Sequence, residues 1–122
     1  MLNRYRKAYE KIAMGLLSFM PNEKDLKVLQ QTIQTYESEP KWELYLYKKD
    51  EDYIGLVGVE KQECELIVHH ISVDPSHRGE GLGKLMVQEL ATLNTDCQVK
   101  SCQLTEPFVE KCLNNNEQEA LS

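Results

Sequence analysis

The residues best suited to bind a ligand are several glycines and an arginine. They lie between an apolar run and a run with helical spacing. They are Arg78, Gly79, Gly81 and Gly83. The apolar run before them ends at Val73-Asp74-Pro75, and the run from 85 to 93 has helical spacing. A helix that begins with glycines presents unpaired backbone N–H groups at the positive end of its dipole, and Arg78 adds a fixed cation. The pattern therefore predicts a binding site for a diphosphate group.

Two common phosphate-binding loops do not fit this spacing. In the loop of nucleoside triphosphatases a glycine stands five residues before Gly-Lys, but Arg78 occupies that position before Gly83, and Leu85 replaces the required hydroxyl. The dinucleotide fingerprint needs a third glycine where Lys84 stands. The remaining alternatives are a different diphosphate ligand and a glycine turn that only joins a strand to a helix.

The arrangement Arg-x-x-Gly-x-Gly, formed by Arg78, Gly81 and Gly83, resembles the acetyl-coenzyme A (acetyl-CoA) loop of the GCN5-related N-acetyltransferase (GNAT) family. The segment 71–90 is similar to the central motif of that family. The resemblance implies acetyl-CoA as cosubstrate. Its pyrophosphate would be held by the loop residues Arg78, Gly79, Glu80, Gly81, Leu82, Gly83 and Lys84, and its pantetheine would pair with the main chain of Ile71, Ser72 and Val73.

The strand before the loop carries two groups that can take up a proton, Glu65 and His69. Strand alternation predicts one face formed by Glu65, Ile67, His69, Ile71 and Val73, and an opposite face that includes His70 and Ser72. Glu65 and His69 are then about 13 Å apart, so only water could connect them. Both fall where the resembled family carries a base, and our hypothesis is that His69 is the base and Glu65 a relay. The alternatives are a surface carboxylate and a neutral core histidine.

The expected reaction is acetyl transfer from acetyl-CoA to a primary amine by direct attack in a ternary complex. Amines are protonated at neutral pH, so a base or a water relay must first remove a proton. Many family members carry an asparagine and a tyrosine where this chain has Thr105 and Cys112, so the acid that protonates the leaving thiolate is unassigned. A non-catalytic sensor or docking module that binds acyl-CoA is therefore the alternative function.

Composition limits the class of protein. The chain of 122 residues is long enough for one domain, 1–122, and its formal net charge of −6 disfavours a nucleic-acid partner. No apolar run is long enough for a membrane span and no signal peptide is recognisable, which predicts a cytoplasmic protein. Four cysteines without metal-ligand spacing predict neither a metal site nor disulfides. The compact length, the run 14–21 and Arg78 with its glycines also resemble small acetyltransferase-like proteins encoded with riboflavin-synthesis genes in Bacillus-type bacteria, which implies a link to riboflavin metabolism.

The elements that must position these residues follow from periodicity and turn residues. The patterns predict a weak strand in 2–7, helices at about 9–20 and 22–36, strands at 42–47, 53–60, 63–73 and 97–104, a helix at 82–93, another beginning at Thr105, and a frayed tail at 114–122. Together with the resemblance they imply an α/β fold of GNAT type. Its sheet is expected to be mixed and mostly antiparallel, with helices on both faces and the C-terminal strands shortened or missing. The resulting unpaired edge predicts a homodimer.

Overall fold

A computed structural model of the chain describes residues 1–20, 23–77 and 79–101. The elements in chain order are β1 (Leu2–Arg4), η1 (Lys7–Tyr9), α1 (Glu10–Leu17), α2 (Leu26–Ser38), β2 (Trp42–Lys49), β3 (Asp52–Gln62), β4 (Glu65–Val73), η2 (Pro75–His77), α3 (Leu82–Leu93) and β5 (Gln98–Ser101). The predicted remainder of the last strand, the helix beginning at Thr105, Cys112 and the polar tail lie outside the described residues.

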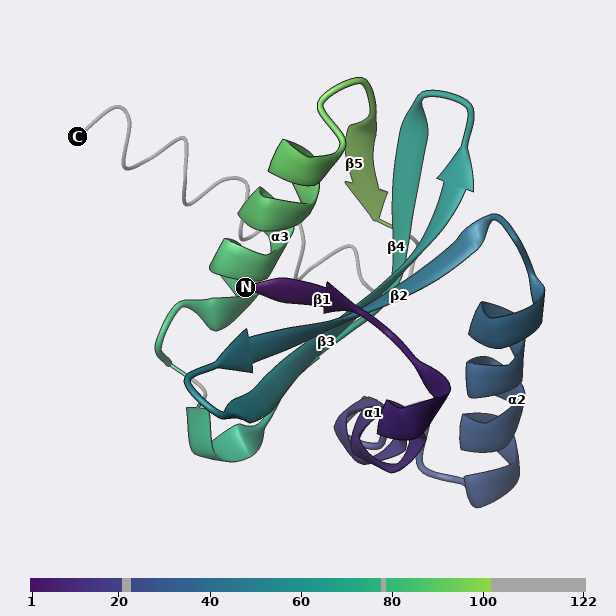
Figure 1. Cartoon of the computed structure of the whole chain (residues 1–122), viewed down its shortest axis with the longest axis vertical. Coiled ribbons are helices and arrows are strands. Elements are labelled where there is room, and N and C mark those ends of the chain that lie inside the picture. Colours follow the sequence, from purple (N-terminus) through teal and green to yellow (C-terminus); the bar gives the residue numbers. More distant parts are fainter. Residues whose placement is uncertain (21–22, 78, 102–122) are drawn as a thin grey trace.

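The strands of the described residues form one five-stranded sheet with the order β1-β2-β3-β4-β5. Strands β1 to β4 are antiparallel to their neighbours, whereas β5 is parallel to β4 because α3 returns the chain between them (Figure 1). The sheet separates α1 and α2 from α3, so each of its faces is covered. The predicted α/β fold, with a mixed and mostly antiparallel sheet and helices on both faces, is confirmed.

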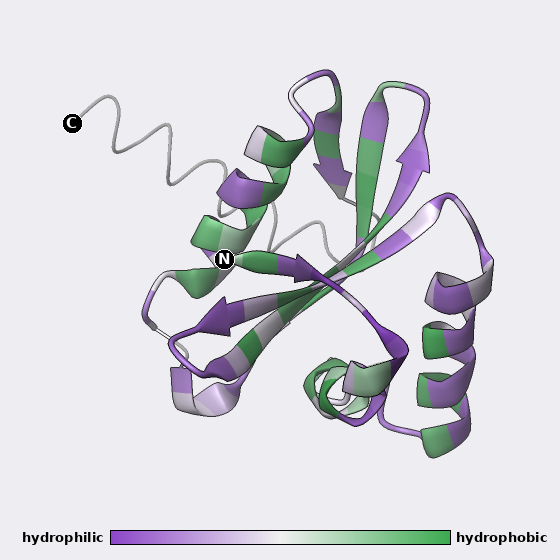
Figure 2. Ribbon diagram, viewed as in Figure 1, coloured by the Kyte–Doolittle hydropathy of each residue, from purple (hydrophilic) through white to green (hydrophobic). Residues whose placement is uncertain are grey.

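Each face of the sheet has its own hydrophobic core. On the α3 face the buried residues are Leu2, Ile54, Val57, Val59, Leu66, Val68, Ile71, Val73, Leu82, Met86, Val87 and Leu90. On the α1 and α2 face they are Ala13, Leu16, Leu17, Leu29, Ile33, Tyr36, Leu44, Leu46 and Leu56. Figure 2 shows hydrophobic and hydrophilic residues interleaved along α2 and α3, as expected for helices that bury one stripe.

A bulge in β4 changes which side chains face each helix layer. Gly58 on β3 pairs with His70, but the next residue, Val59, pairs with Val68, so His69 is the extra residue. Leu66 and Val68 before the bulge, and Ile71 and Val73 after it, all belong to the α3-side core. Strict alternation from Glu65 to Val73 is therefore a wrong prediction, because one inserted residue reverses the alternation. As a result, His69 and His70 both lie on the α1 and α2 face.

Local sequence determines where two of the helices, α2 and α3, begin. Helix α2 begins after Asp25, whose carboxylate accepts a hydrogen bond of 2.7 Å from the Lys27 backbone N–H. Asn22, at the predicted start of this helix, lies outside the described residues. Helix α3 begins after Gly81, whose φ of 75° is in the left-handed region that favours glycine, so that the chain can turn from η2 into the helix.

Candidate active site

The glycine loop forms an open cradle at the start of α3. Gly79 and Gly81 have φ values of 86° and 75°, and no atom lies within 4 Å of the place where a Cβ would stand on either residue. Arg78 lies outside the described residues. The backbone N–H groups in the first turn of a helix lie at the positive end of its dipole, where they can bind an anion. This space and these donors fit a pyrophosphate.

A carboxylate in the middle of this loop is neutralised by its neighbours. Lys49, at the end of β2, places its Nζ 3.0 Å from Glu80 Oε1, and His77 Nδ1 lies 3.4 Å from Glu80 Oε2. The hydrogen bond from Lys49 is the main cause that lowers the pKa of Glu80 below its ordinary value, with His77 adding to it. The β2–β3 hairpin therefore brings a cation to a loop whose expected ligand is an anion.

The main chain of the predicted pantetheine segment has one edge without a strand partner in the described part of the molecule. Ile71 and Val73 pair with Val57 and Gly55 of β3 on one side. On the other side, β5 pairs with β4 only over 65–68. The side chain of Ser72 is buried and donates to the carbonyl of Leu16 at 2.7 Å. Because the side chain is used inside the fold, a ligand at 71–73 would be recognised by backbone groups.

His69 stands between an aromatic ring and a carboxylate. Its imidazole stacks on Trp42 with the ring centroids 4.4 Å apart, and its Nε2 lies 2.9 Å from Glu60 Oε1. The side chain of His69 is 24% exposed, so an acceptor could reach it. Hydrogen bonds from Gln62 first and from His69 second hold the pKa of Glu60 below its ordinary value. An ionised Glu60 fixes the tautomer of His69 with the proton on Nε2, which leaves Nδ1 as the basic nitrogen.

The structure does not bring Glu65 to His69. Glu65 is exposed at the start of β4, opposite Gln62 on β3 and Gln98 on β5. The carboxylate beside His69 is Glu60, which sequence reasoning missed. A signal existed, because the short turn after β3 sets Glu60 opposite Ile67 and so makes it a diagonal cross-strand neighbour of His69.

His70 belongs to a second and more deeply buried hydrogen-bonded cluster. Its Nε2 lies 2.9 Å from Glu23 Oε1, and its Nδ1 lies 2.6 Å from the Tyr36 hydroxyl. Thr32 donates to both oxygens of Glu23, at 3.1 and 2.9 Å. Glu23 is 5% exposed and sits just before α2, so the cluster fastens that segment to β4. Burial is the main cause that lowers the pKa of His70, with Glu23 acting in the opposite direction.

The two histidine clusters touch through their aromatic rings. Tyr36 packs edge-on against Trp42 and against His70, with centroids 5.5 Å apart in both pairs. Since Trp42 stacks on His69, the four rings form one continuous group on the α1 and α2 face, and each imidazole has its own carboxylate partner. The bulge makes this possible, because it turns two consecutive side chains of β4 to the same face.

Three further observations concern residues 1–20, 23–77 and 79–101. No group of three histidine, cysteine or acidic side chains in these ranges is arranged to hold a metal ion. None of the helices they form is long and apolar enough to cross a membrane. Cys64 and Cys97 are free thiols.

Comparison with known proteins identifies relatives and folds of the same kind. The model of the acetyltransferase (GNAT) domain family matches residues 40–121. An uncharacterized N-acetyltransferase from the lysA 3′ region of Bacillus methanolicus is 57% identical over 113 residues, which cover 92% of this chain and 94% of that protein.

Solved structures show the same fold at low identity. The structure of the acetyltransferase AAC(6′)-Iy in complex with the bisubstrate analog CoA-S-monomethyl-acetylneamine has a TM-score of 0.73 and 13% identity, covering 95% of this chain and 87% of that one. A possible acetyltransferase from Clostridium difficile 630 has a TM-score of 0.75 and 12% identity, covering 93% and 88%. The family match over most of the chain and the 57% identity to an N-acetyltransferase establish that this chain belongs to the GNAT family of acetyltransferases.

Proposed function

We propose that this acetyltransferase moves an acetyl group from acetyl-CoA to a primary amine by direct attack in a ternary complex, with His69 as the base. The observation that carries the proposal is the pair formed by His69 and Glu60 at the bulge, immediately before the open main-chain edge at 71–73. The ring nitrogen that does not contact Glu60 is free to take a proton from an amine.

The residues that would hold acetyl-CoA are those named from the sequence. The open cradle around Gly79 and Gly81 supports the pyrophosphate site, and the neutralised Glu80 removes the charge that would oppose it. Among the described residues, 71–73 has a strand partner on only one side, β3, and this supports the pantetheine site. When bound there, acetyl-CoA supplies an activated acetyl group as a thioester.

The protein's part in the reaction is to orient the base and to remove a proton. Glu60 holds the Nε2–H of His69, so His69 Nδ1 accepts the proton of the incoming ammonium, and the resulting imidazolium is stabilised by the same carboxylate. Partial exposure of His69 lets that proton pass to water. The relay through Glu65 stays a prediction, and substitutions of Glu60 and Glu65 separate the two carboxylates.

An amine acceptor is supported by related folds. The bisubstrate analog in the AAC(6′)-Iy structure joins CoA to an acetylated neamine. The link to riboflavin metabolism rests on sequence resemblance. An acetyl-transfer assay with amine-bearing flavin precursors as acceptors would test this link. A cytoplasmic protein agrees with the free thiols of Cys64 and Cys97. A homodimer is also part of the proposal; sedimentation of the protein as a monomer at high concentration would contradict it.

The first experiment measures binding and turnover separately. Calorimetric titration of acetyl-CoA into the wild type should show binding that Gly81→Asp abolishes, because this change places a negative charge and a Cβ at a left-handed residue of the loop. Release of free CoA should then require both an amine and His69. Binding without any amine-dependent release would favour the sensor function, and full activity of His69→Gln would refute the assignment of the base.

A further inference from the structure

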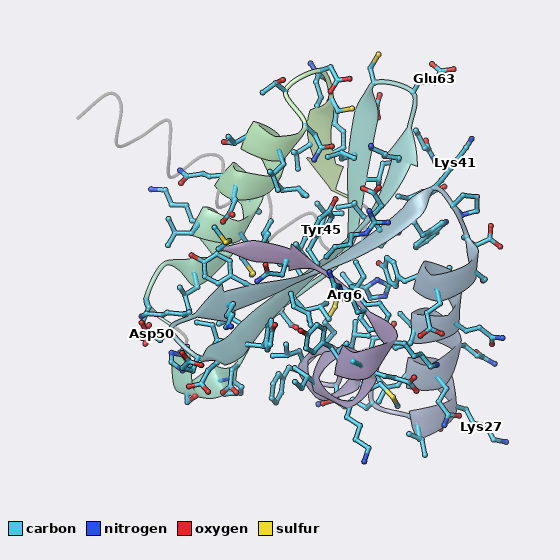
Figure 3. The ribbon with its side chains drawn as sticks, viewed as in Figure 1. Arg6, Lys27, Lys41, Tyr45, Asp50 and Glu63 are labelled. Carbon is cyan, nitrogen blue, oxygen red and sulfur yellow. The ribbon has the colours of Figure 1, made fainter. Side chains whose placement is uncertain are left out.

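Two turns that are far apart in the sequence meet at one end of the sheet, and each carries a cysteine. Figure 1 shows the turn between β3 and β4 beside the turn between α3 and β5. Cys64 lies in the first turn and Cys97 in the second. Glu63, the residue before Cys64, is exposed at the tip of its turn (Figure 3). Neither thiol has a part in the proposed acetyl transfer.

The strand register sets the two cysteines opposite each other. Strands β4 and β5 are parallel with Glu65 opposite Gln98, and the Gln98 backbone N–H donates to the carbonyl of Cys64 at 2.8 Å. Cys64 and Cys97 are the residues immediately before that pair, so their Cα atoms are separated by one strand spacing, about 5 Å. A disulfide requires a Cα separation of about 4.4–6.8 Å. The backbone is therefore already placed for a bond between the two sulfurs.

Both cysteine side chains lie on the α3 face of the sheet. Leu66 and Val99 are opposite each other and pack in the core of that face. Cys97 stands two residues before Val99 and packs against the same core. Cys64 stands two residues before Leu66, so alternation gives it the same side. The Sγ atom of Cys97 lies 4.0 Å from the carbonyl oxygen of Glu63, which shows that it is directed toward the turn that carries Cys64.

The two thiols differ in exposure. Cys64 is exposed, whereas Cys97 is partly buried. Burial first and the Asp96 carboxylate second raise the pKa of the Cys97 thiol, the nearby Cys64 thiol adds to the rise, and Lys61 opposes it. Since a dissolved oxidant reaches an exposed thiol more easily, Cys64 is the sulfur that is attacked first and Cys97 the sulfur that reacts second.

We propose that Cys64 and Cys97 form an oxidation site, at which hydrogen peroxide converts the two free thiols into a reversible intramolecular disulfide. The Cys64 thiolate attacks one peroxide oxygen, the O–O bond breaks, and Cys64 becomes a sulfenic acid while the other oxygen leaves as water. The Cys97 thiolate then attacks the Cys64 sulfur, the S–S bond forms, and the S–O bond breaks to release hydroxide, which takes up a proton. Two thiols and one hydrogen peroxide thus give one disulfide and two waters. The peroxide is reduced by two electrons, one from each sulfur.

The disulfide would fasten β5 to β4. These strands pair only over 65–68 in the described part of the chain, so β5 has few backbone hydrogen bonds of its own. A bond between Cys64 and Cys97 closes the segment 64–97, which contains all of β4 and α3, into a loop. Closing this loop restricts the unfolded chain, so the oxidised protein should unfold at a higher urea concentration than the reduced protein. This inference does not depend on the proposed acetyl transfer.

Peptide mapping of the folded, full-length protein tests the bond directly. The protein is treated with hydrogen peroxide at low protein concentration, its remaining thiols are alkylated, and it is digested with trypsin without a reductant. Cleavage sites between the cysteines, at Arg78, Lys84, Lys100 and Lys111, place the four cysteines of the chain in four separate peptides. We expect mass spectrometry to find the Cys64 peptide joined to the Cys97 peptide, and dithiothreitol to separate them.

Serine variants assign the two roles. Cys97→Ser should leave a sulfenic acid at Cys64 that dimedone traps, and Cys64→Ser should leave Cys97 as a free thiol. The matched control, Cys102→Ser together with Cys112→Ser, should still form the bond and should show the rise in the urea midpoint on oxidation. Full alkylation of both thiols after peroxide, or sulfur bonds only to Cys102, Cys112 or a second chain, would overturn the inference. An unchanged or lower urea midpoint of the oxidised protein would refute the fastening of β5.

Discussion

Replacing Gly58 by alanine tests whether the aromatic group on the α1 and α2 face is as tightly packed as the structure indicates. A Cβ added at Gly58 would lie 2.1 Å from the Tyr36 hydroxyl oxygen and 2.4 Å from Cζ of the same ring. The ring cannot move aside freely. It is 7% exposed, is hydrogen-bonded to His70 at 2.6 Å, and packs against Trp42.

The expected loss of stability has two parts. Overpacking a rigid core site costs about 1–3 kcal/mol. Displacing the Tyr36 hydroxyl from His70 removes a buried hydrogen bond worth about 1 kcal/mol. The free energy of unfolding should therefore fall by about 2–4 kcal/mol, a large share of the 5–15 kcal/mol typical of a domain. Activity should also fall, because the displaced ring supports Trp42 and through it His69.

Urea unfolding of the variant and of two matched glycine substitutions is the assay. Gly15, inside α1, has no atom within 4 Å of its added Cβ, so Gly15→Ala should stabilise the protein by about 0.5–1 kcal/mol. Gly55→Ala would meet the Met86 sulfur at 2.7 Å, but this side chain is flexible, so its cost should be smaller than that of Gly58→Ala. A Gly58→Ala variant within about 0.5 kcal/mol of the wild type would refute the packing argument.

Three further predictions concern charge. Lys49→Gln should weaken CoA binding several-fold, whereas Lys48→Gln in the same hairpin should not; equal effects in calorimetry would show a nonspecific charge effect. Burial lowers the pKa of His70 in the folded protein below the value of about 6.5 in the unfolded chain. Between these two pKa values the unfolded chain binds more protons than the folded one. The stability contributed by His70 is therefore fully present above about pH 6.5 and is lost as the pH falls through the folded-state pKa. Urea midpoints should accordingly show a weaker acid loss for His70→Gln than for the wild type. Glu60→Gln should slow acetyl transfer more than Glu65→Gln, and the opposite order in a CoA-release assay would favour the Glu65 relay.

Much of the fold could be predicted because the decisive patterns are local. The helix at 82–93 was predicted with the bounds that the structure gives to α3, because its apolar spacing and its glycine start are both short-range features. The two strands of the 42–60 hairpin were predicted slightly short, and the glycines of the second one lie beside the register shifts of β3. Helix α2 begins after Asp25, three residues later than predicted, because the Asp25 carboxylate caps it.

By itself, the sequence determined the glycine loop, the polarity of its surroundings and the order of the elements, because these depend on residue types within about one turn or one strand. It also pointed to His69. Strict alternation wrongly placed Ile71 and Val73 on the same face as His69, and the carboxylate in contact with His69, Glu60, was missed. The relay through Glu65 stays a prediction.

Only the tertiary structure decided the arrangement around His69. One inserted residue in β4 places His69 and His70 on the same face, and cross-strand pairing brings Glu60 to His69. Residues far apart in the sequence, Glu23 and Tyr36, complete the second cluster. The physical reason is that the position of a bulge depends on how two neighbouring strands pair and pack. The hydrophobic periodicity of a single strand does not contain that information.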